Sequence, residues 1–144
     1  MPYIIWSDFF SVGVPYIDRQ HQKLIHIVND FYAAYRSNLP EHLIFQILNQ
    51  LTEYAEEHFR DEERLMKAAK YPREEYEQHI KKHEKLLLDI FEINDQLSTG
   101  NKRAIFNLEL FLNTWLIRHI LETDKLYQPY CRILHNFNPS EAKL

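Results

Sequence analysis

The sequence predicts an all-α protein, folded as an up-down-up-down antiparallel four-helix bundle with an extended N-terminal arm. Apolar residues recur at three- and four-residue steps in four long stretches, and no stretch shows the sustained two-residue alternation of a β-strand. Turn-forming residues separate these stretches at 37–40, 70–72 and 98–101. The connections are short, and short connections make successive helices antiparallel neighbours.

Length and composition fit one domain. The chain has 144 residues, with 17 Lys and Arg against 21 Asp and Glu and a formal net charge of −4, which argues against nucleic-acid binding. The N-terminus lacks the features of a secretory signal, no run approaches the ~20 apolar residues of a membrane span, and Cys131 has no partner for a disulfide. We therefore expect a cytoplasmic domain over 1–144 without membrane insertion, made of an arm (1–16), a bundle (about 17–130) and a tail (131–144).

The N-terminal half contributes the arm and two helices. Apolar arm residues are expected to pack across the bundle, and they are Ile4, Ile5, Trp6, Phe9 and Phe10. One face of the first helix carries Ile17, His21, Leu24, Val28, Phe31 and Tyr35. Pro40 suits the first turn of the second helix, where a missing N–H has no cost. The inner face of that helix carries Ile44, Ile47, Leu48, Leu51, Ala55, His58, Glu62 and Leu65.

The C-terminal half contributes two further helices. Pro72 suits the start of the third helix and Gly100 its end. The inner face of the third helix carries Tyr76, His79, Ile80, His83, Leu87, Ile90 and Leu97. The fourth helix carries Ile105, Leu108, Leu112, Trp115 and His119 on one face. After about Pro129 we expect a tail with a loop-like run at 136–139.

Polar groups that normally lie in water interrupt the apolar faces. They are His21, His58, Glu62, His79, His83 and His119. Burying such groups costs several kcal/mol unless a partner satisfies them, so the core holds either a hydrogen-bond network or a metal ion. His58 and Glu62 lie one helical turn apart, as do His79 and His83. Two such pairs on adjacent helices, joined by inward histidines from the other two helices, favour the metal site.

Asp124 is not nominated by this periodicity. It lies five residues after His119, which is ~140° further around an ideal helix. It could reach the inner face only if the fourth helix is locally distorted or ends there.

Four motifs lie between about Trp6 and Tyr130. They are Gly-Val-Pro-Tyr-Ile-Asp-Arg-Gln-His at 13–21, His58-x-x-x-Glu62, His79-x-x-x-His83, and Trp-Leu-x-x-His-Ile-x-x-x-Asp-Lys at 115–125. Together they resemble the hemerythrin family, and in particular its single-domain microbial members, the bacteriohemerythrins. The resemblance implies two iron ions joined by an oxo or hydroxo bridge. It also implies seven metal ligands, which are His21, His58, Glu62, His79, His83, His119 and Asp124.

The resemblance also assigns these ligands to the two ions. One iron would be held by His79, His83 and His119, and the other by His21 and His58, with Glu62 and Asp124 bridging both. If both irons are six-coordinate, these donors and the oxo or hydroxo bridge fill every position except one. A small molecule can occupy that position without displacing a protein donor. Similarity suggests that it is lined by Leu24, Phe59, Trp115, Leu116 and Ile120, whose other interpretation is ordinary bundle core.

The function implied is reversible O2 binding for carriage, storage or delivery, by a protein that is not an enzyme. NO and small anions are further expected ligands. Three alternatives stay open: a sensor of O2, NO or redox state; a di-iron enzyme that reduces peroxide or NO; and a structural bundle with zinc or no metal. The enzyme is disfavoured because ferritin-like di-iron bundles use Glu-x-x-His pairs, which are absent here. His26, His42 and His135 lack a second donor at metal spacing.

Overall fold

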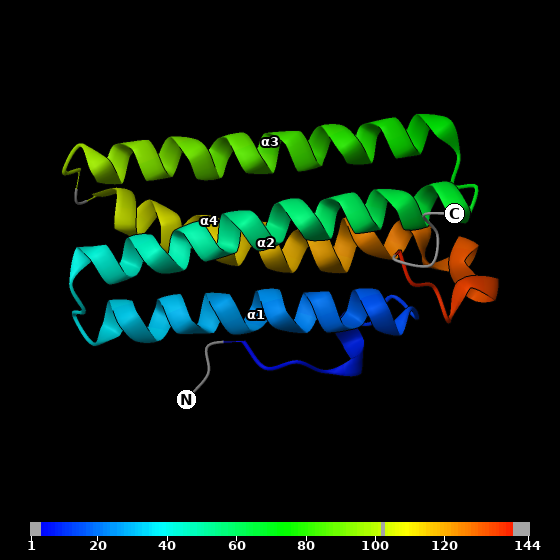
Figure 1. Cartoon of the computed structure of the whole chain (residues 1–144), viewed down its shortest axis with the longest axis horizontal. Helices are drawn as coiled ribbons and strands as arrows, with labels where there is room; N and C mark the ends of the chain where they lie inside the picture. The colour runs from blue at the N-terminus through cyan, green and yellow to red at the C-terminus, as the bar shows by residue number, and fades with distance from the viewer. Residues whose placement is uncertain (1–3, 102, 140–144) are drawn as a thin grey trace.

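The computed structural model of the chain describes residues 4–101 and 103–139, apart from the side chains of 116 and 117. Within this part of the chain there are four long helices and no strand: α1 (Pro15–Arg36), α2 (Glu41–Ala68), α3 (Arg73–Ser98) and α4 (Arg103–Arg118). In Figure 1, α2 runs between α1 and α3, and α4 lies behind it. Each helix contacts the next one, and α4 contacts α1, which closes the bundle. The predicted all-α four-helix bundle is confirmed.

The helix boundaries follow the expected turn residues. Pro40 and Pro72 immediately precede α2 and α3, and their carbonyls accept hydrogen bonds from the first turn of each helix. Gly100 lies two residues beyond the end of α3 with φ of 83°, a left-handed conformation that favours glycine. Its N–H donates to the carbonyl of Leu97 at 3.1 Å. The predicted connections are therefore present at the expected places.

The N-terminal arm differs in detail from its prediction. It contains a short 3₁₀ helix, η1 (Asp8–Phe10), and it ends at Val14 because Pro15 suits the first position of α1. Asn29 pairs with the backbone of Ile4 through two hydrogen bonds of 2.8 Å. Ile4, Trp6 and Phe10 pack on the core, but the expectation was wrong for Ile5 and Phe9, which are each 72% exposed.

The segment after α4 is more helical than expected. It continues as a π-helix, η2 (His119–Thr123), and then as a 3₁₀ helix, η3 (Asp124–Leu134). Residues 131–134 therefore extend η3 instead of starting a tail, because Tyr127 and Cys131 are buried in the core and hold this segment against the bundle. Residues 136–139 form no helix, as predicted.

The buried apolar residues form two clusters rather than one. The larger cluster takes residues of α1 from Leu24 onward and of α2 up to Phe59. The smaller cluster takes Ile17 of α1, Leu65 of α2, and residues of η3. The inward polar residues lie where the two clusters meet: His21 falls between Ile17 and Leu24 in α1, and Glu62 falls between Phe59 and Leu65 in α2. Among the described residues, no helix is long and apolar enough to cross a membrane.

Candidate metal centre

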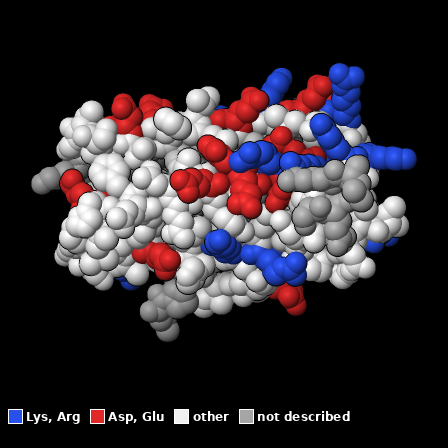
Figure 2. Space-filling model, viewed as in Figure 1, with Lys and Arg blue, Asp and Glu red and all other residues white. Residues whose placement is uncertain are grey.

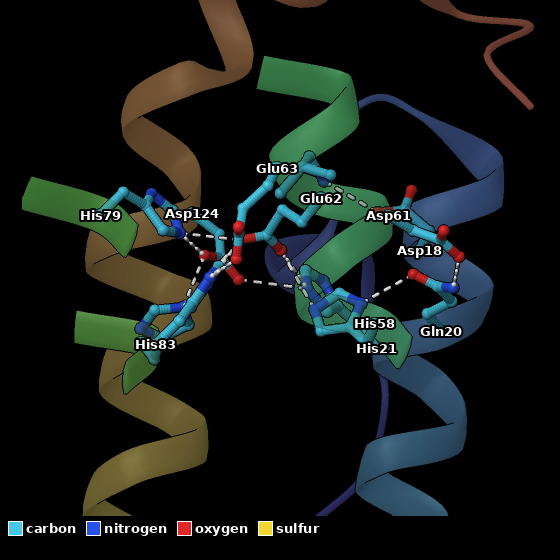
Figure 3. Close-up of polar contacts among 12 residues, drawn as sticks. Asp18, Gln20, His21, His58, Asp61, Glu62, Glu63, His79, His83 and Asp124 are labelled. Carbon is cyan, nitrogen blue, oxygen red and sulfur yellow. Dashed lines mark hydrogen bonds and ion pairs between the residues drawn. The ribbon is translucent and has the colours of Figure 1, made fainter. Parts of the chain in front are cut away.

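All seven candidate residues lie together in the interior of the bundle. His21 comes from α1, His58 and Glu62 from α2, and His79 and His83 from α3, while His119 begins η2 and Asp124 begins η3. None of the seven is more than 8% exposed. Figure 3 labels six of the seven and shows the side chains of His79, His83 and Asp124 pointing toward those of His21, His58 and Glu62. Four separate stretches of sequence therefore supply one compact group of donors.

The donors form two overlapping groups. One group contains His79, His83 and His119, and the other contains His21 and His58; both groups include Glu62 and Asp124. Within each group one donor atom from every residue lies within 4.8 Å of the others. The two carboxylates are thus shared by both groups, while three histidines belong to one group and two to the other.

Glu62 presents one oxygen to each group. Its Oε1 lies 2.7 Å from Nε2 of His79 and 3.2 Å from Nε2 of His83. Its Oε2 lies 3.1 Å from Nε2 of His58 and 3.5 Å from Nε2 of His21. This is the arrangement that a carboxylate needs in order to bridge two cations.

Asp124 divides its oxygens in the same way. Its Oδ1 lies 3.0 Å from Nε2 of His119 and 3.2 Å from Nε2 of His79, whereas Oδ2 lies 3.1 Å from Nε2 of His21. The side chain reaches the centre because the helix is distorted at this point, one of the two conditions that the sequence left open. The N–H of Asp124 donates to the carbonyl of His119, five residues earlier, so the wider turn brings both onto the inner face.

The donor set fits a transition-metal cation. Among the described residues, His21 Nε2, Glu62 Oε2 and both carboxylate oxygens of Asp124 are buried without a well-oriented hydrogen bond, although each lies 3.0–3.5 Å from another donor of the centre. Unpartnered buried polar atoms are costly, and a bound cation would satisfy all of them at once. Imidazole and carboxylate together suit iron, and also manganese, zinc and copper.

Electrostatics hold the carboxylates in their charged form. Burial alone would raise the pKa of Glu62, but the surrounding His58, His21 and His79 keep that pKa well below its usual range. Burial and the neighbouring Glu62 likewise act to raise the pKa of Asp124, and His119 and His21 outweigh them, so this pKa is also lowered. Both carboxylates are therefore ionised at neutral pH and available to a cation.

The histidines do not titrate alike. Burial opposes the charged form of His21 and His79, but their contacts with Asp124 and Glu62 outweigh it and raise the pKa of His21 to about 9 and that of His79 to about 10. For His58 burial dominates, and its pKa is lowered. In the metal-free protein, protons on His21 and His79 therefore partly balance the two carboxylates.

Three residues that the sequence analysis missed support the donors from outside. Gln20 Oε1 lies 2.7 Å from Nδ1 of His58, and Gln20 Nε2 donates to Asp61 Oδ2 at 2.8 Å. Glu63 Oε2 lies 3.1 Å from Nδ1 of His83. Histidines that bind metals usually donate their second ring N–H to such groups. A search for polar residues near each predicted histidine ligand could therefore have found these three.

Four of the five residues expected to line the ligand position are buried. Leu24, Phe59, Trp115 and Ile120 all belong to the larger apolar cluster. The ring of Phe59 stacks on that of His83 with centroids 3.9 Å apart, and its centroid is 5.7 Å from that of His58. Phe59 therefore contacts both donor groups. The side chain of Leu116 lies outside the described residues.

The other histidines lie away from the centre. His26, His42 and His135 are exposed, and none of them belongs to either donor group. His26 instead approaches Asp30, one turn further along α1, at 3.6 Å. Cys131 is buried at 3% exposure, as expected of a packing residue.

A four-helix bundle with a buried histidine and carboxylate cluster defines a class of cation-binding proteins. Residues 12–131 match the family model of the hemerythrin HHE cation binding domain, and the chain therefore belongs to the hemerythrin family.

Relatives and solved structures agree with this assignment. The chain is 27% identical over 127 residues to a bacteriohemerythrin of Stenotrophomonas maltophilia, covering 88% of this chain and 80% of the relative. It is 29% identical to a bacteriohemerythrin of Clostridium acetobutylicum, covering 85% and 97%. A wild-type hemerythrin crystal structure superimposes with a TM-score of 0.76 at 25% identity, covering 88% of this chain and 96% of that one.

Proposed function

We propose that this chain binds two iron ions through the seven donors and binds O2 reversibly, for carriage, storage or delivery. The observation that carries the proposal is the division of each carboxylate between the two donor groups. Glu62 and Asp124 each direct one oxygen to the His79 group and the other to the His21 group. A single ion would not require two carboxylates in this arrangement, whereas a pair of ions would.

The unequal donor numbers indicate where a small ligand would bind. His79, His83 and His119 would hold one iron, and His21 and His58 the other, with Glu62 and Asp124 serving both. The second ion then has one protein donor fewer than the first. Held by these residues, a pair of ferrous ions would provide the two electrons that reversible binding of O2 requires. NO and small anions would compete for the same position.

The surrounding residues would favour release of O2 over its reduction. Leu24, Phe59, Trp115 and Ile120 are at most 4% exposed. A wall that is largely apolar excludes water, disfavours the departure of a charged oxygen species and limits the entry of protons. These effects slow the irreversible oxidation of the centre.

The donor set favours a binding protein over a di-iron enzyme. Five imidazoles and two carboxylates carry less negative charge than the carboxylate-rich centres of ferritin-like oxidases. A less anionic centre holds O2 with less tendency to activate it. We also propose that arm, bundle and tail fold as one domain, because Val12 and Val14 share an apolar cluster with Tyr127 and Cys131.

Metal analysis and gas exposure test the proposal. Protein from iron-supplied cells is expected to contain two irons per chain. The reduced, colourless protein should become coloured in air and lose that colour under vacuum. The variant His58→Ala should lose this response, whereas His26→Ala, which alters an exposed histidine, should keep it. Zinc or no metal in the wild type, or a colour that vacuum does not remove, would contradict O2 carriage.

A further inference from the structure

We propose that Gln20 and Asp61 are positioning residues that hold His58 in the tautomer whose Nε2 lone pair faces the metal centre. This inference rests on the metal-binding role proposed for His58, and it is independent of which gas the centre takes. Gln20 lies on α1, and Asp61 lies on α2 together with His58. Figure 3 shows the Gln20 amide beside the ring of His58.

The first step is the orientation of the Gln20 amide. Asp61 is only 6% exposed and accepts from three donors: Gln20 Nε2 at 2.8 Å, the Tyr16 hydroxyl at 3.1 Å and an Arg64 guanidinium nitrogen at 3.4 Å. A carboxylate accepts hydrogen bonds and does not donate them. The amide must therefore turn its NH2 group toward Asp61, which leaves its oxygen facing His58.

The second step is the position of the ring proton. Gln20 Oε1 lies 2.7 Å from Nδ1 of His58, and an amide oxygen can only accept, so Nδ1 carries the hydrogen. A neutral imidazole protonated at Nδ1 has its lone pair on Nε2. That atom faces the centre, 3.1 Å from Glu62 Oε2. The contacts of Asp61 thus determine, through Gln20, which nitrogen of His58 is available to a cation.

The two halves of the centre are supported differently. His83, in the three-histidine group, meets the carboxylate of Glu63 directly at 3.1 Å. His58, in the two-histidine group, meets a neutral amide, and the carboxylate is one residue further away. A carboxylate in direct contact makes an imidazole more basic than an amide does. Gln20 therefore fixes the direction of the His58 lone pair without strengthening its donation as much as Glu63 strengthens that of His83.

The outer end of this chain of contacts reaches the surface. Tyr16, Asp61 and Arg64 line a polar cavity of about 390 Å³ together with Glu53, Glu57 and Arg60. Acidic and basic side chains gather over the middle of α2 on the face shown in Figure 2. Asp61 therefore lies at the boundary between this charged surface and the dry interior. There the Arg64 guanidinium and the Tyr16 hydroxyl stabilise its negative charge.

Substitutions that change the donors and acceptors one at a time test the proposal. Gln20→Met removes both amide contacts at similar length. Asp61→Asn removes the requirement that orients the amide, since an asparagine can both donate and accept. Gln20→Glu places two carboxylates against each other. The double variant Gln20→Glu/Asp61→Asn restores both hydrogen bonds and reverses only the one between residues 20 and 61, because the new carboxylate accepts from Nδ1 of His58 and also from the new amide.

The first measurement is the tautomer of His58 in metal-free protein, by ¹⁵N NMR of the ring nitrogens at pH 8. The wild type and the double variant are expected to be protonated at Nδ1, and Asp61→Asn to show a mixture of tautomers. The second measurement is calorimetric titration with Zn²⁺. Gln20→Met should lower the affinity for one of two equivalents by about 10–100-fold and leave the other unchanged.

Matched controls separate positioning from general packing. Glu63→Gln should weaken the other equivalent instead, and Glu56→Gln, an exposed change on α2, should affect neither. Wild-type tautomer and affinity in both Gln20→Met and Asp61→Asn would overturn the proposal. So would equal loss of both equivalents in Gln20→Met without rescue in the double variant. If the wild type takes two Zn²⁺ but its iron form does not release O2, the proposed function fails and this inference stands.

Discussion

The backbone N–H of Asp124 donates to the carbonyl of His119, across five residues instead of the four of an α-helix. This single wider turn places a carboxylate and an imidazole from the same segment on the same side of the centre, 3.0 Å apart. Single π-turns inside α-helices are found mostly at functional sites, since they are less stable than regular turns. Here the distortion supplies the second shared carboxylate.

Asp124→Asn should destabilise the metal-free protein. His21 and His79 carry protons at neutral pH, and removing the charge of Asp124 leaves them buried without one of their two partners. Breaking a buried ion pair in this way costs about 3–5 kcal/mol. Urea denaturation at pH 7 measures the loss. Glu122→Gln, an exposed change in η2, should shift the free energy of unfolding by no more than about 0.5 kcal/mol. Equal stability of Asp124→Asn and the wild type would show that the pair is not charged.

The stability of the metal-free protein should decline in alkaline solution. The folded pKa values of His21 and His79, about 9 and about 10, lie above the ordinary value of 6.5. Groups with a raised pKa stabilise the folded state fully below pH 6.5, and this contribution is lost as the pH rises through 9 and 10. Glu62 and Asp124, whose pKa values are lowered, act in the opposite sense and lose their contribution in acid.

In urea denaturation of the metal-free protein between pH 4 and pH 10, the stabilisation from these four groups should therefore be greatest between about pH 5 and pH 6.5, and the lowered pKa of His58 should move the maximum toward the upper end of this range. With saturating Zn²⁺ the alkaline decline from His21 and His79 should disappear, because ring nitrogens that hold a metal carry no proton. Parallel curves with and without Zn²⁺ would contradict this explanation.

Metal binding should release protons. At pH 7.5 His21 and His79 are protonated, and both rings must lose a proton before Nε2 can coordinate. About two protons per chain should appear when the centre fills, and the affinity should fall as the pH is lowered. Calorimetric titration in two buffers with different ionisation enthalpies measures the number. A result near zero would mean that these histidines are neutral before the metal arrives.

Phe59→Ala should harm both the fold and the retention of O2. The Phe59 ring stacks on His83 and is 3% exposed, so its removal should cost about 3–5 kcal/mol of folding free energy. The cavity would also admit water beside the centre and accelerate irreversible oxidation. Denaturation and the rate of colour loss in air measure the two effects. Phe91→Ala is the matched control, because Phe91 is 66% exposed. Unchanged oxidation in Phe59→Ala would exclude its role as a barrier.

The periodicity of the sequence was enough to predict the four helices and six of the inward polar residues. A histidine on an apolar face is visible from spacing alone, because the spacing follows the regular turn of a helix. Asp124 broke this rule, since the π-turn between it and His119 leaves no signal in residue spacing. It was identified only through the family resemblance.

The polar contacts that support the metal ligands from outside the inner face could not be predicted in the same way. Gln20 precedes His21, and Asp61 and Glu63 flank Glu62, so all three lie about 100° away from the inner face on a helical projection. Their importance depends on which side chains the neighbouring helix brings to them. Ile5 and Phe9 show the same limit for apolar residues, because hydrophobic character alone does not indicate which side of an irregular arm faces the bundle.

The polar layer between the two apolar clusters has a consequence for how the molecule opens. Among the described residues the buried apolar side chains form two separate clusters, and local opening is easiest where buried apolar contacts are few. We expect amide hydrogen exchange in the metal-free protein to be faster around His58 and His79 than toward the α1–α2 turn. Two bound metal ions would join the two ends into one cooperative unit of unfolding. Iron would then stabilise the folded state in addition to binding O2.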